Sequence, residues 1–327
     1  MLEPDVQAVV IEEFGPPEVL ALREAADPRL GRGDVLVEVE FSSVTFVDTQ
    51  IRSGRAPRPS MLPQLPAILG NGVGGRVVAV GAEVDGDLVG ARALATTGGT
   101  GGYAQLASVP AAAIISIPAE VAMGDAVALL ADGRTAVGLI DRAAIQPGET
   151  VLVEAAAGGV GSLLVQLARR DGARVVAVAG GERKLEVARA LGAEIAVDYR
   201  RPSWAEEVRS AVGDYGVDVV FDGVGGSTGR DAFQLLRRGG RLCTFGMAAG
   251  SFAAISDEEL TDCDVTRLRG AVADAREMAA LSARALSSAA AGELRAVIGQ
   301  EHPLANAAEA HRAIEARATI GKTLLVP

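Results

Sequence analysis

The sequence predicts an α/β protein that joins a doubly wound parallel sheet to a second, mainly β region. Two observations support this fold class. From about residue 122 to residue 294, apolar strand-like runs alternate with helical stretches, whereas residues 6–121 contain short strand-like runs separated by turns. With 327 residues, the chain is long enough for two domains. We therefore expect one domain at 122–294 and another formed by 1–121 together with 295–327.

The first region is predicted to be mostly β. Residues 35–40 alternate between apolar and charged side chains, and residues 76–80 form an apolar run after a cluster of glycines. The glycine-rich residues 98–102 predict a flexible loop. Near the end of the chain, a short amphipathic helix at 305–316 and a closing strand at 322–327 are expected to rejoin this region.

The second region is predicted to supply the parallel sheet. A helix is expected at 162–170 and an alanine-rich helix at about 274–291. Six strand-like runs are present, which is the number in a full doubly wound sheet. They lie at 151–155, 174–179, 194–199, 217–222, 241–246 and 265–270.

The most informative stretch is the glycine turn at 156–161, between the first of these strands and its helix. It follows the pattern G-x-G-x-x-G with Ala156 in the first place and Gly158 and Gly161 in the other two. Glycines let a dinucleotide pyrophosphate approach the backbone, and the helix N-terminus faces the phosphates. Because a second strand follows at 174–179, the pattern favours a Rossmann βαβ unit over a tight turn in another kind of parallel-sheet protein.

The end of the second strand predicts the choice of cofactor. NAD(H) would require an Asp or Glu there to bind the ribose hydroxyls. The chain has Gly180 and Gly181 followed by Glu182, Arg183 and Lys184. Small residues beside two cations leave space and positive charge for a 2′-phosphate, which favours NADP(H). The alternative is that Glu182 reaches the ribose.

Composition excludes several classes of function. The net charge of −11 and the pI near 4.9 argue against a nucleic-acid surface. No apolar run reaches membrane-spanning length, and residues 1–5 lack the basic region of a signal peptide. Two cysteines, Cys243 in a strand and Cys263 beside acids, suggest reduced thiols in a cytoplasmic protein.

The order of these motifs resembles the zinc-independent quinone oxidoreductase branch, which includes zeta-crystallin, of the medium-chain dehydrogenase/reductase superfamily. The family motif A-x-x-G-G-V-G matches residues 155–161, and the motif N-F-x-D-x-y-x-R-x-G is similar to residues 45–54. Other matching pieces lie at 102–104, 134–136, 198–200, 221–225, 245–250 and 321–322. The resemblance implies a GroES-like catalytic domain of mainly β structure beside the Rossmann domain. The exposed edge at 265–270 suggests a homodimer.

The chain departs from this family at several positions. Thr45 stands where relatives often have Asn, Gln50 where they have Tyr, and Asn71 where they have Glu. In relatives the first two positions line the nicotinamide and substrate cleft. Arg134 also replaces a residue that is commonly apolar, and it either reaches the mouth of the cleft or is an exposed surface arginine.

The residues argue against zinc, although zinc alcohol dehydrogenases share this architecture. A structural zinc site takes four ligands, usually cysteines, and a catalytic site takes about three. The chain has two cysteines and two histidines, all beyond residue 240, away from the region that holds zinc in the superfamily. We expect His302 in a loop and His311 on an exposed helix face.

The resemblance implies hydride transfer from C4 of NADPH to a small-molecule quinone or to the β-carbon of an enone. Negative charge then develops on the acceptor oxygen, so hydrogen-bond donors are needed there. The catalytic candidates are Thr45, Gln50 and Thr135. Gln50 cannot act as an acid, so water is expected to supply the proton. Asp48 is expected to orient backbone or cofactor groups.

The residues predicted to contact the cofactor are carried over from the motifs. They are Asp48, Thr135, Gly158, Gly159, Val160, Gly161, Gly180, Gly181, Arg183, Lys184, Tyr199, Val224, Phe245, Gly246, Met247 and Lys322. Two alternative functions stay open at this stage. One is an enone or enoyl-thioester reductase, for example one that tailors a secondary metabolite, and the other is an NADPH-binding protein with little turnover.

Overall fold

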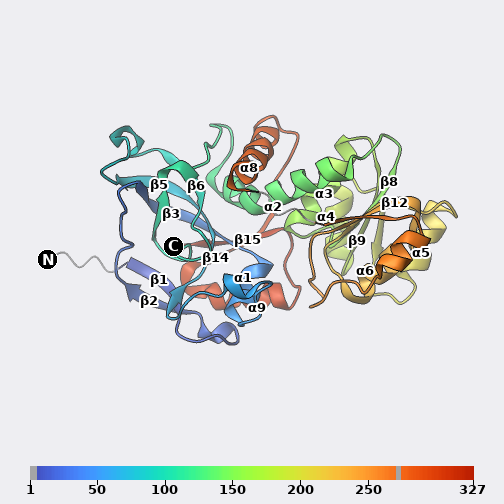
Figure 1. The fold of residues 1–327 in the computed structure, drawn as a ribbon, viewed down its shortest axis with the longest axis horizontal. Coiled ribbons are helices and arrows are strands. Elements are labelled where there is room, and N and C mark those ends of the chain that lie inside the picture. The colour runs from blue at the N-terminus through green and yellow to red at the C-terminus, as the bar shows by residue number, and fades with distance from the viewer. Residues whose placement is uncertain (1–5, 270–273) are drawn as a thin grey trace. The chain divides into compact units, whose positions relative to one another are not determined.

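The computed structural model describes residues 6–269 and 274–327, which form two compact units (Figure 1). Unit 1 contains the described residues up to Ala131 together with Ser282–Gly292 and Ala296–Pro327, and unit 2 contains Asp132–Leu281 and Glu293–Arg295. Two features of the sequence analysis lie outside the described residues. They are residues 1–5, which lack the basic region of a signal peptide, and residue 270, the last of the strand expected at 265–270.

Unit 2 contains the predicted six-stranded parallel sheet. Its order is β10-β9-β8-β11-β12-β13, which is the order of a doubly wound Rossmann sheet. The central strands are buried on both faces, as their continuous apolar sequences require. The strands are β8 (Thr150–Glu154), β9 (Arg174–Ala179), β10 (Ile195–Asp198), β11 (Val217–Asp222), β12 (Leu236–Thr244) and β13 (Thr266–Arg269).

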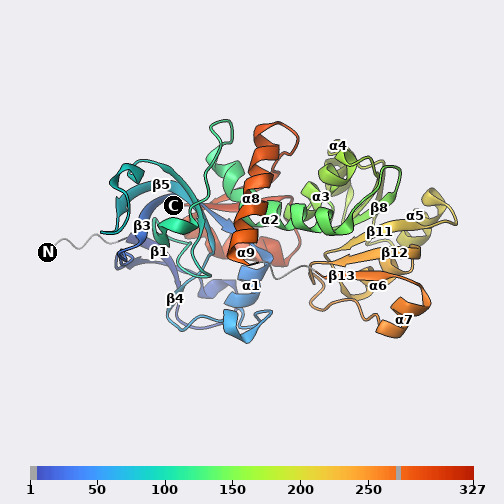
Figure 2. The ribbon, with the colours of Figure 1, turned by 45° about the horizontal axis from the view of Figure 1, so that its top comes forward.

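Helices cover both faces of this sheet. Figure 2 shows α3 and α4 on one face and α6 on the other. Trp204 and Val208 of α5 and Phe233 of α6 pack in one buried cluster with the strands. Helix α3 begins at Gly159, three residues before the expected start, because part of the glycine turn is already helical. The helices are α3 (Gly159–Arg170), α4 (Glu182–Ala190), α5 (Trp204–Val212), α6 (Gly226–Phe233) and α7 (Asp257–Asp262).

Unit 1 is mainly β, as predicted. One sheet has the order β2-β1-β4, and the other has the order β14-β15-β3-β5-β6, with β7 also paired to β3. The strands are β1 (Val6–Ile11), β2 (Ala21–Ala25), β3 (Asp34–Val44), β4 (Ala67–Ile68), β5 (Gly72–Val80), β6 (Arg92–Thr96), β7 (Leu106–Pro110), β14 (Ile298–Pro303) and β15 (Lys322–Val326). The helices that pack on them are α1 (Phe46–Arg52) and α9 (Ala307–Glu315).

Two helices, α2 (Met123–Ala143) and α8 (Ala275–Ala290), contain residues of both units. Residues 122–131 and 282–292, which the sequence places in the second domain, cluster with unit 1. Ser282 is fully buried, and its hydroxyl donates to the carbonyl oxygen of Leu130 at 3.1 Å. This contact joins α8 to α2 within unit 1.

The expected positions of both histidines were wrong. His302 lies in β14, a strand that pairs in parallel with β15, and not in a loop. His311 is fully buried on the inner face of α9, and the Tyr103 hydroxyl lies 3.1 Å from its Nε2 atom. The many alanines of α9 conceal which face of the helix is apolar, because alanine fits both inner and outer faces.

Candidate functional site

Apart from Thr135 on α2, the residues of unit 2 that were predicted to contact the cofactor lie along one edge of the parallel sheet. Each group follows the carboxyl end of a strand, and parallel strands present their carboxyl ends at the same edge. In strand order they are Tyr199 after β10, Gly180 and Gly181 after β9, Gly158–Gly161 after β8, Val224 after β11, and Phe245–Met247 after β12.

The geometry of the glycine turn fits a pyrophosphate. Gly158 caps α3, and no side chain satisfies the first N–H groups of that helix from the cap position. A Cβ atom added at Gly158 would approach only the carbonyl oxygen of Ala155, at 3.1 Å. At Gly161 it would lie 2.2 Å from the same oxygen. Gly158 therefore leaves space for a ligand, and Gly161 allows the helix to pack on the strand end.

One carboxylate lies against this turn. A Cβ atom at Gly159 would lie 2.0 Å from Asp132 Oδ2, so the Asp132 side chain of α2 packs directly on the glycine. Negative charge is favourable at a helix N-terminus. Burial lowers the pKa of the neighbouring Arg134, and the charge of Asp132 raises it. Arg134 is thus half-buried beside Asp132 and is not a fully exposed surface arginine.

An arginine that the sequence interpretation missed lies beside the two glycines after β9. Gly181 has φ of +96°, and a Cβ atom there would lie 2.8 Å from Arg200 Nη2. Arg200 also donates from Nη2 to Asp198 Oδ2 at 2.7 Å, which lowers the pKa of Asp198 to about 2. The sequence held a signal for this role, because Arg200 lies two residues after the end of β10, next to Tyr199. Asp198 pairs in register with Ala179 of β9, the residue before the two glycines.

The two predicted cations begin helix α4. Arg183 is exposed and Lys184 is half-buried in its first turn. Glu182, the residue that could have bound a ribose, forms an ion pair with Arg189 of the same helix. Both side chains of this pair are exposed to solvent, so the pair holds the Glu182 carboxylate only weakly.

The loop after β11 is held from two sides. The Val224 N–H donates to Glu154 Oε2 at 3.0 Å, and Val224 is buried. A Cβ atom at Gly223 would lie 2.6 Å from the Phe245 ring, so Phe245 packs on the loop. Glu154 ends β8 directly before the glycine turn, and the sequence interpretation assigned it no role.

In unit 1, Thr45 and Asp48 form a capping box at the start of α1. Asp48 Oδ2 accepts from both the Thr45 N–H and the Thr45 hydroxyl at 2.7 Å, and the Asp48 N–H donates to Thr45 Oγ1 at 3.2 Å. Asp48 thus orients backbone. The hydroxyl hydrogen of Thr45 is directed at this carboxylate, so Thr45 could donate to a substrate only after breaking that bond.

Asp48 belongs to a buried polar network. Burial raises its pKa, whereas hydrogen bonds from Thr45 and Tyr103 and the charge of Lys322 lower it. Tyr103 is also 3.1 Å from His311, and burial lowers the pKa of His311 to about 3, so this imidazole is neutral. Lys322, a predicted cofactor contact, lies buried beside this network.

The catalytic candidates fall in different units. Gln50 is half-buried on α1 of unit 1, and its Nε2 atom donates to Thr49 Oγ1 at 3.3 Å. An amide nitrogen carries two hydrogens, so Gln50 has a second donor. Thr135 is half-buried on α2 within unit 2, the unit that contains the glycine turn.

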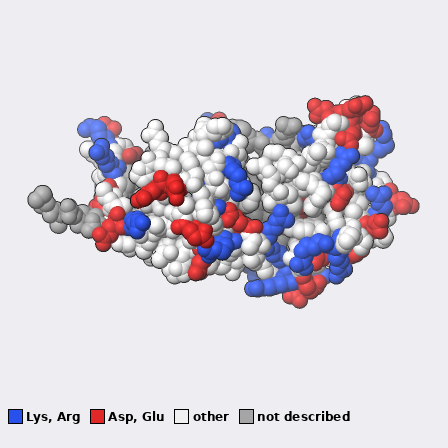
Figure 3. All heavy atoms as spheres, turned by 90° about the horizontal axis from the view of Figure 1, so that it is seen from below, with Lys and Arg blue, Asp and Glu red and all other residues white. Residues whose placement is uncertain are grey.

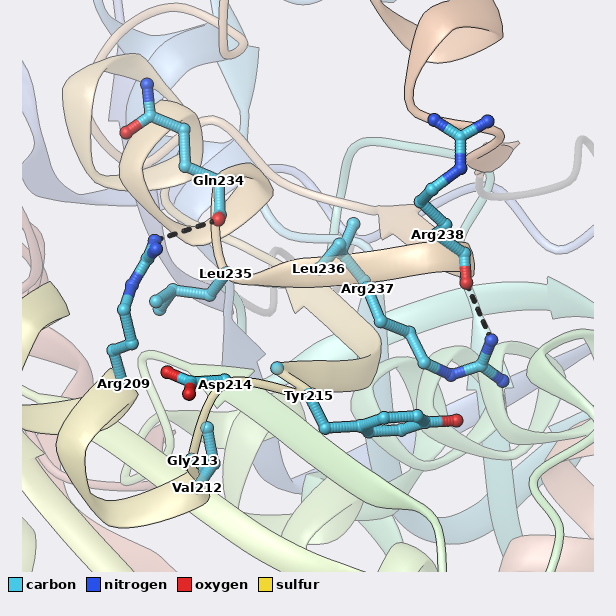
Figure 4. Close-up of a pocket in the computed structure, with 11 residues that line it drawn as sticks. Arg209, Val212, Gly213, Asp214, Tyr215, Gln234, Leu235, Leu236, Arg237 and Arg238 are labelled. Atoms are coloured by element: carbon cyan, nitrogen blue, oxygen red, sulfur yellow. Dashed lines mark hydrogen bonds between the residues drawn. The ribbon is translucent and has the colours of Figure 1, made fainter.

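A separate cavity of about 490 Å³ lies at the opposite edge of the parallel sheet, at the amino ends of β11 and β12 (Figure 4). Arg209 donates to the carbonyl oxygen of Gln234 at 3.1 Å. Arg237 lies over the Tyr215 ring, 5.4 Å from its centroid, and Arg238 points elsewhere. Because the guanidinium groups do not converge, we assign no part of the cofactor site to this cavity.

Surface charge, helix hydropathy and metal-ligating side chains each bear on a prediction from the sequence. On the face seen in Figure 3, basic side chains lie among acidic ones. None of the helices in the described part of the chain is long and apolar enough to cross a membrane. Within residues 6–269 and 274–327, no group of three or more His, Cys, Asp or Glu side chains could hold a metal ion.

Comparison with known proteins identifies similar chains. Residues 31–119 match the alcohol dehydrogenase GroES-like domain, and residues 159–286 match the zinc-binding dehydrogenase family. A probable quinone oxidoreductase of Schizosaccharomyces pombe is 33% identical over 97% of this chain and 96% of its own length. The 2-haloacrylate reductase of a Burkholderia species is 32% identical over 98% and 99%. The structure of Escherichia coli quinone oxidoreductase complexed with NADPH has a TM-score of 0.89 at 29% identity, covering 98% of this chain and 100% of that chain.

Proposed function

Because this chain belongs to the quinone oxidoreductase branch of the medium-chain dehydrogenase/reductase superfamily, we propose that it transfers hydride from NADPH to a quinone or a related electron-poor carbonyl acceptor. The observation that carries the proposal is the glycine turn of unit 2, which leaves Gly158 open and the N-terminus of α3 without a side-chain cap. That geometry binds the pyrophosphate of a dinucleotide. The relatives and neighbouring structures support the cofactor and the acceptor class.

The residues at the carboxyl edge of the sheet would hold the cofactor. Gly158–Gly161 receive the pyrophosphate, and Gly180 and Gly181 leave space for the adenosine ribose. Arg183, Lys184 and Tyr199 are proposed to bind the 2′-phosphate. Val224 and Phe245–Met247 line the same edge. When bound, NADPH supplies the hydride, and the protein supplies position and electrostatics.

On the acceptor side, Gln50 is the donor best suited to an acceptor oxygen. Its second amide hydrogen is a neutral donor, whereas the Thr45 hydroxyl is held by Asp48. Thr135 is the corresponding candidate from unit 2. Neither Gln50 nor a threonine is an acid in the ordinary pH range, so water supplies the proton to the reduced acceptor.

The test is NADPH oxidation with matched panels of quinones and enones. Turnover of small quinones with NADPH is the expected result. Turnover of enones or enoyl thioesters with quinones inert would replace the proposed acceptor with a conjugated double bond. Tight NADPH binding without turnover of either panel would remove the enzymatic proposal.

Three further parts of the proposal concern the whole protein. We expect it to work without zinc, since its two cysteines and two histidines lie beyond residue 240. We expect a homodimer, because β13 ends the six-stranded sheet and presents an edge to a second copy. A cytoplasmic location is supported by two cysteines that are both unpaired.

A further inference from the structure

Two carboxyl groups are buried at the carboxyl ends of adjacent central strands. Glu154 ends β8 and Asp222 ends β11, and both side chains have 0% exposure. Each carboxyl group accepts a backbone hydrogen bond through one of its oxygens. The Val224 N–H donates to Glu154 Oε2 at 3.0 Å, and the Gly225 N–H donates to Asp222 Oδ1 at 2.7 Å.

The other oxygen of each carboxyl group, Glu154 Oε1 and Asp222 Oδ2, is buried and has no protein donor among the described residues. Two ionised carboxylates in a dry interior repel each other and lose their hydration. A single proton between the groups removes the repulsion and gives the remaining charge a hydrogen bond, because the protonated carboxyl donates to the ionised one. The two oxygens without a donor are those that such a proton would join.

We propose that Glu154 and Asp222 share one proton and act together as positioning residues for the loop at 223–225, which forms part of the dinucleotide site. The inference of a shared proton depends only on the buried pair. The inference of a positioning role also depends on the proposed function. The pair joins the strand that enters the glycine turn to the loop that follows β11. Helix α6 closes over it, since a Cβ atom at Gly229 would lie 2.9 Å from Asp222 Oδ2.

The surroundings of the pair favour retention of the proton. Burial and the charge of Asp222 raise the pKa of Glu154, while the N–H groups of Gly223 and Val224 lower it by less. On the neighbouring strand β12, Cys243 pairs in register with Phe221, and burial raises the pKa of its thiol to about 12, so this group stays neutral. Asp222 is the charged group that acts on Glu154.

This pair links stability to pH with a definite sign. In the unfolded chain a glutamate loses its proton near its ordinary pKa of about 4.3. The folded protein keeps the proton to higher pH because the pKa of Glu154 is raised. The stabilising contribution is therefore complete below the unfolded pKa and is lost as the pH rises through the folded pKa. Above that pH the two charges repel, the loop loosens, and dinucleotide affinity falls.

The test compares the unmodified protein with Glu154→Gln, Glu154→Ala and Asp218→Asn. A glutamine amide can donate to Asp222 at every pH. The free energy of unfolding in urea should therefore fall less for Glu154→Gln than for the unmodified protein when the pH is raised from about 5 to about 9. Its affinity for NADPH should stay within about twofold at neutral pH and exceed that of the unmodified protein at about pH 9. Glu154→Ala should bind both NADPH and NADH about tenfold more weakly, with their ratio unchanged.

Asp218→Asn is the matched control for Glu154→Gln, because it makes the same change from a carboxylate to an amide, at the opposite end of β11. Asp218 forms an ion pair with Arg237, so this variant should lose stability and keep the pH dependence of the unmodified protein. Parallel pH profiles for Glu154→Gln and the unmodified protein would overturn the shared proton. Unchanged affinity in Glu154→Ala would overturn the positioning role.

Two further outcomes are decisive. If Glu154→Ala does not fold, the positioning role is judged from NADPH affinity at about pH 9, where equal values for Glu154→Gln and the unmodified protein would refute it. If the unmodified protein binds no dinucleotide, the proposed function fails, and the unfolding comparison still decides whether the proton is shared.

Discussion

At the scale of single residues, Lys184 is the cation whose loss tests the choice of cofactor most directly. It lies in the first turn of α4, directly after the two glycines that follow β9. A charge-assisted hydrogen bond contributes about 1.5–3 kcal/mol, so Lys184→Ala should weaken NADPH binding by roughly tenfold to a hundredfold. NADH affinity should barely change, because NADH lacks the 2′-phosphate.

Titration of both cofactors into each variant measures this ratio. Arg170→Ala removes an exposed cation from the end of α3 and should leave the ratio as it is. Equal affinity of the unmodified protein for NADPH and NADH would rule out a role for Lys184 in the preference. Arg200 is held against Gly181 by its ion pair with Asp198. The titration of NADPH and NADH should therefore include an Arg200→Ala variant.

Gln50 tests the identity of the acceptor. A reduced quinone anion is stabilised by resonance and is easily protonated by water, whereas an enolate from a thioester benefits by a factor of about 100 from a placed acid. We expect faster turnover of small quinones than of crotonyl thioesters. Gln50→Tyr should change quinone turnover only modestly and should raise thioester turnover if the pocket admits that substrate.

Gln50→Phe is the matched control for this substitution, since it adds an aromatic ring without a phenol. Steady-state rates for both acceptors in the three proteins separate proton supply from pocket shape. Efficient thioester reduction by the unmodified protein, with quinones inert, would favour an enoyl-thioester reductase over the proposed function.

At the scale of secondary-structure elements, the turn between β8 and α3 contains two glycines that should respond differently. Gly158→Val should abolish binding of both dinucleotides while the fold survives, because its side chain would enter the space left for the pyrophosphate. Gly161→Val should instead prevent folding, since its Cβ atom would lie 2.2 Å from the Ala155 carbonyl oxygen. Thermal unfolding and dinucleotide titration distinguish the two results. A folded Gly158→Val with unchanged affinity would show that this turn is not the site.

Helix α2 contributes Asp132, whose carboxylate lies against Gly159 at the N-terminus of α3. This carboxylate is favourable for the helix and unfavourable for an incoming pyrophosphate. Asp132→Asn should therefore raise the affinities for NADPH and NADH alike, by about tenfold at low salt, and should lower the unfolding temperature of the free protein.

The same change at Asp141, an exposed residue of α2, is the control and should alter neither quantity appreciably. Calorimetric titration at two salt concentrations would detect the effect, since added salt should reduce the gain in affinity. If Asp132→Asn binds both cofactors as the unmodified protein does, the carboxylate has no part in the pyrophosphate site.

At the scale of the whole molecule, the metal-free proposal gives a direct prediction. Prolonged treatment with a chelator should leave NADPH oxidation intact, and metal analysis should find zinc well below one atom per chain. This expectation follows from the ligand count, because two cysteines and two histidines cannot form a four-cysteine structural site. Activity that is lost on chelation and restored by zinc would contradict it.

The parallel sheet could be predicted from the sequence because its strands are buried on both faces and therefore appear as continuous apolar runs. The strand β14, with the sequence Ile298-Gly-Gln-Glu-His-Pro303, could not, since it is short, polar and mostly half-exposed or exposed. Its pairing with β15 depends on a partner that local sequence does not reveal.

The candidate site could also be predicted only in part from the sequence. The glycine turn has a recognisable pattern, because the phosphate requires those residues at that spacing. Glu154 and Asp222 have no such pattern, since each looks like the final residue of an apolar strand. Their proximity follows only from the pairing of β8 with β11. Arg200 was overlooked because its role depends on two strands that are neighbours in space.

The pairing of β15 with β3 has a consequence for synthesis on the ribosome. β3 leaves the ribosome early, yet its residues Ser42, Ser43 and Val44 pair with β15, which is made much later. The strands of unit 2 emerge completely in the meantime. In the nascent chain, part of β3 therefore keeps an unpaired edge until β15 has been made, and an unpaired edge is prone to aggregation. A premature stop codon before Lys322 would remove β15 and leave that edge of β3 open permanently.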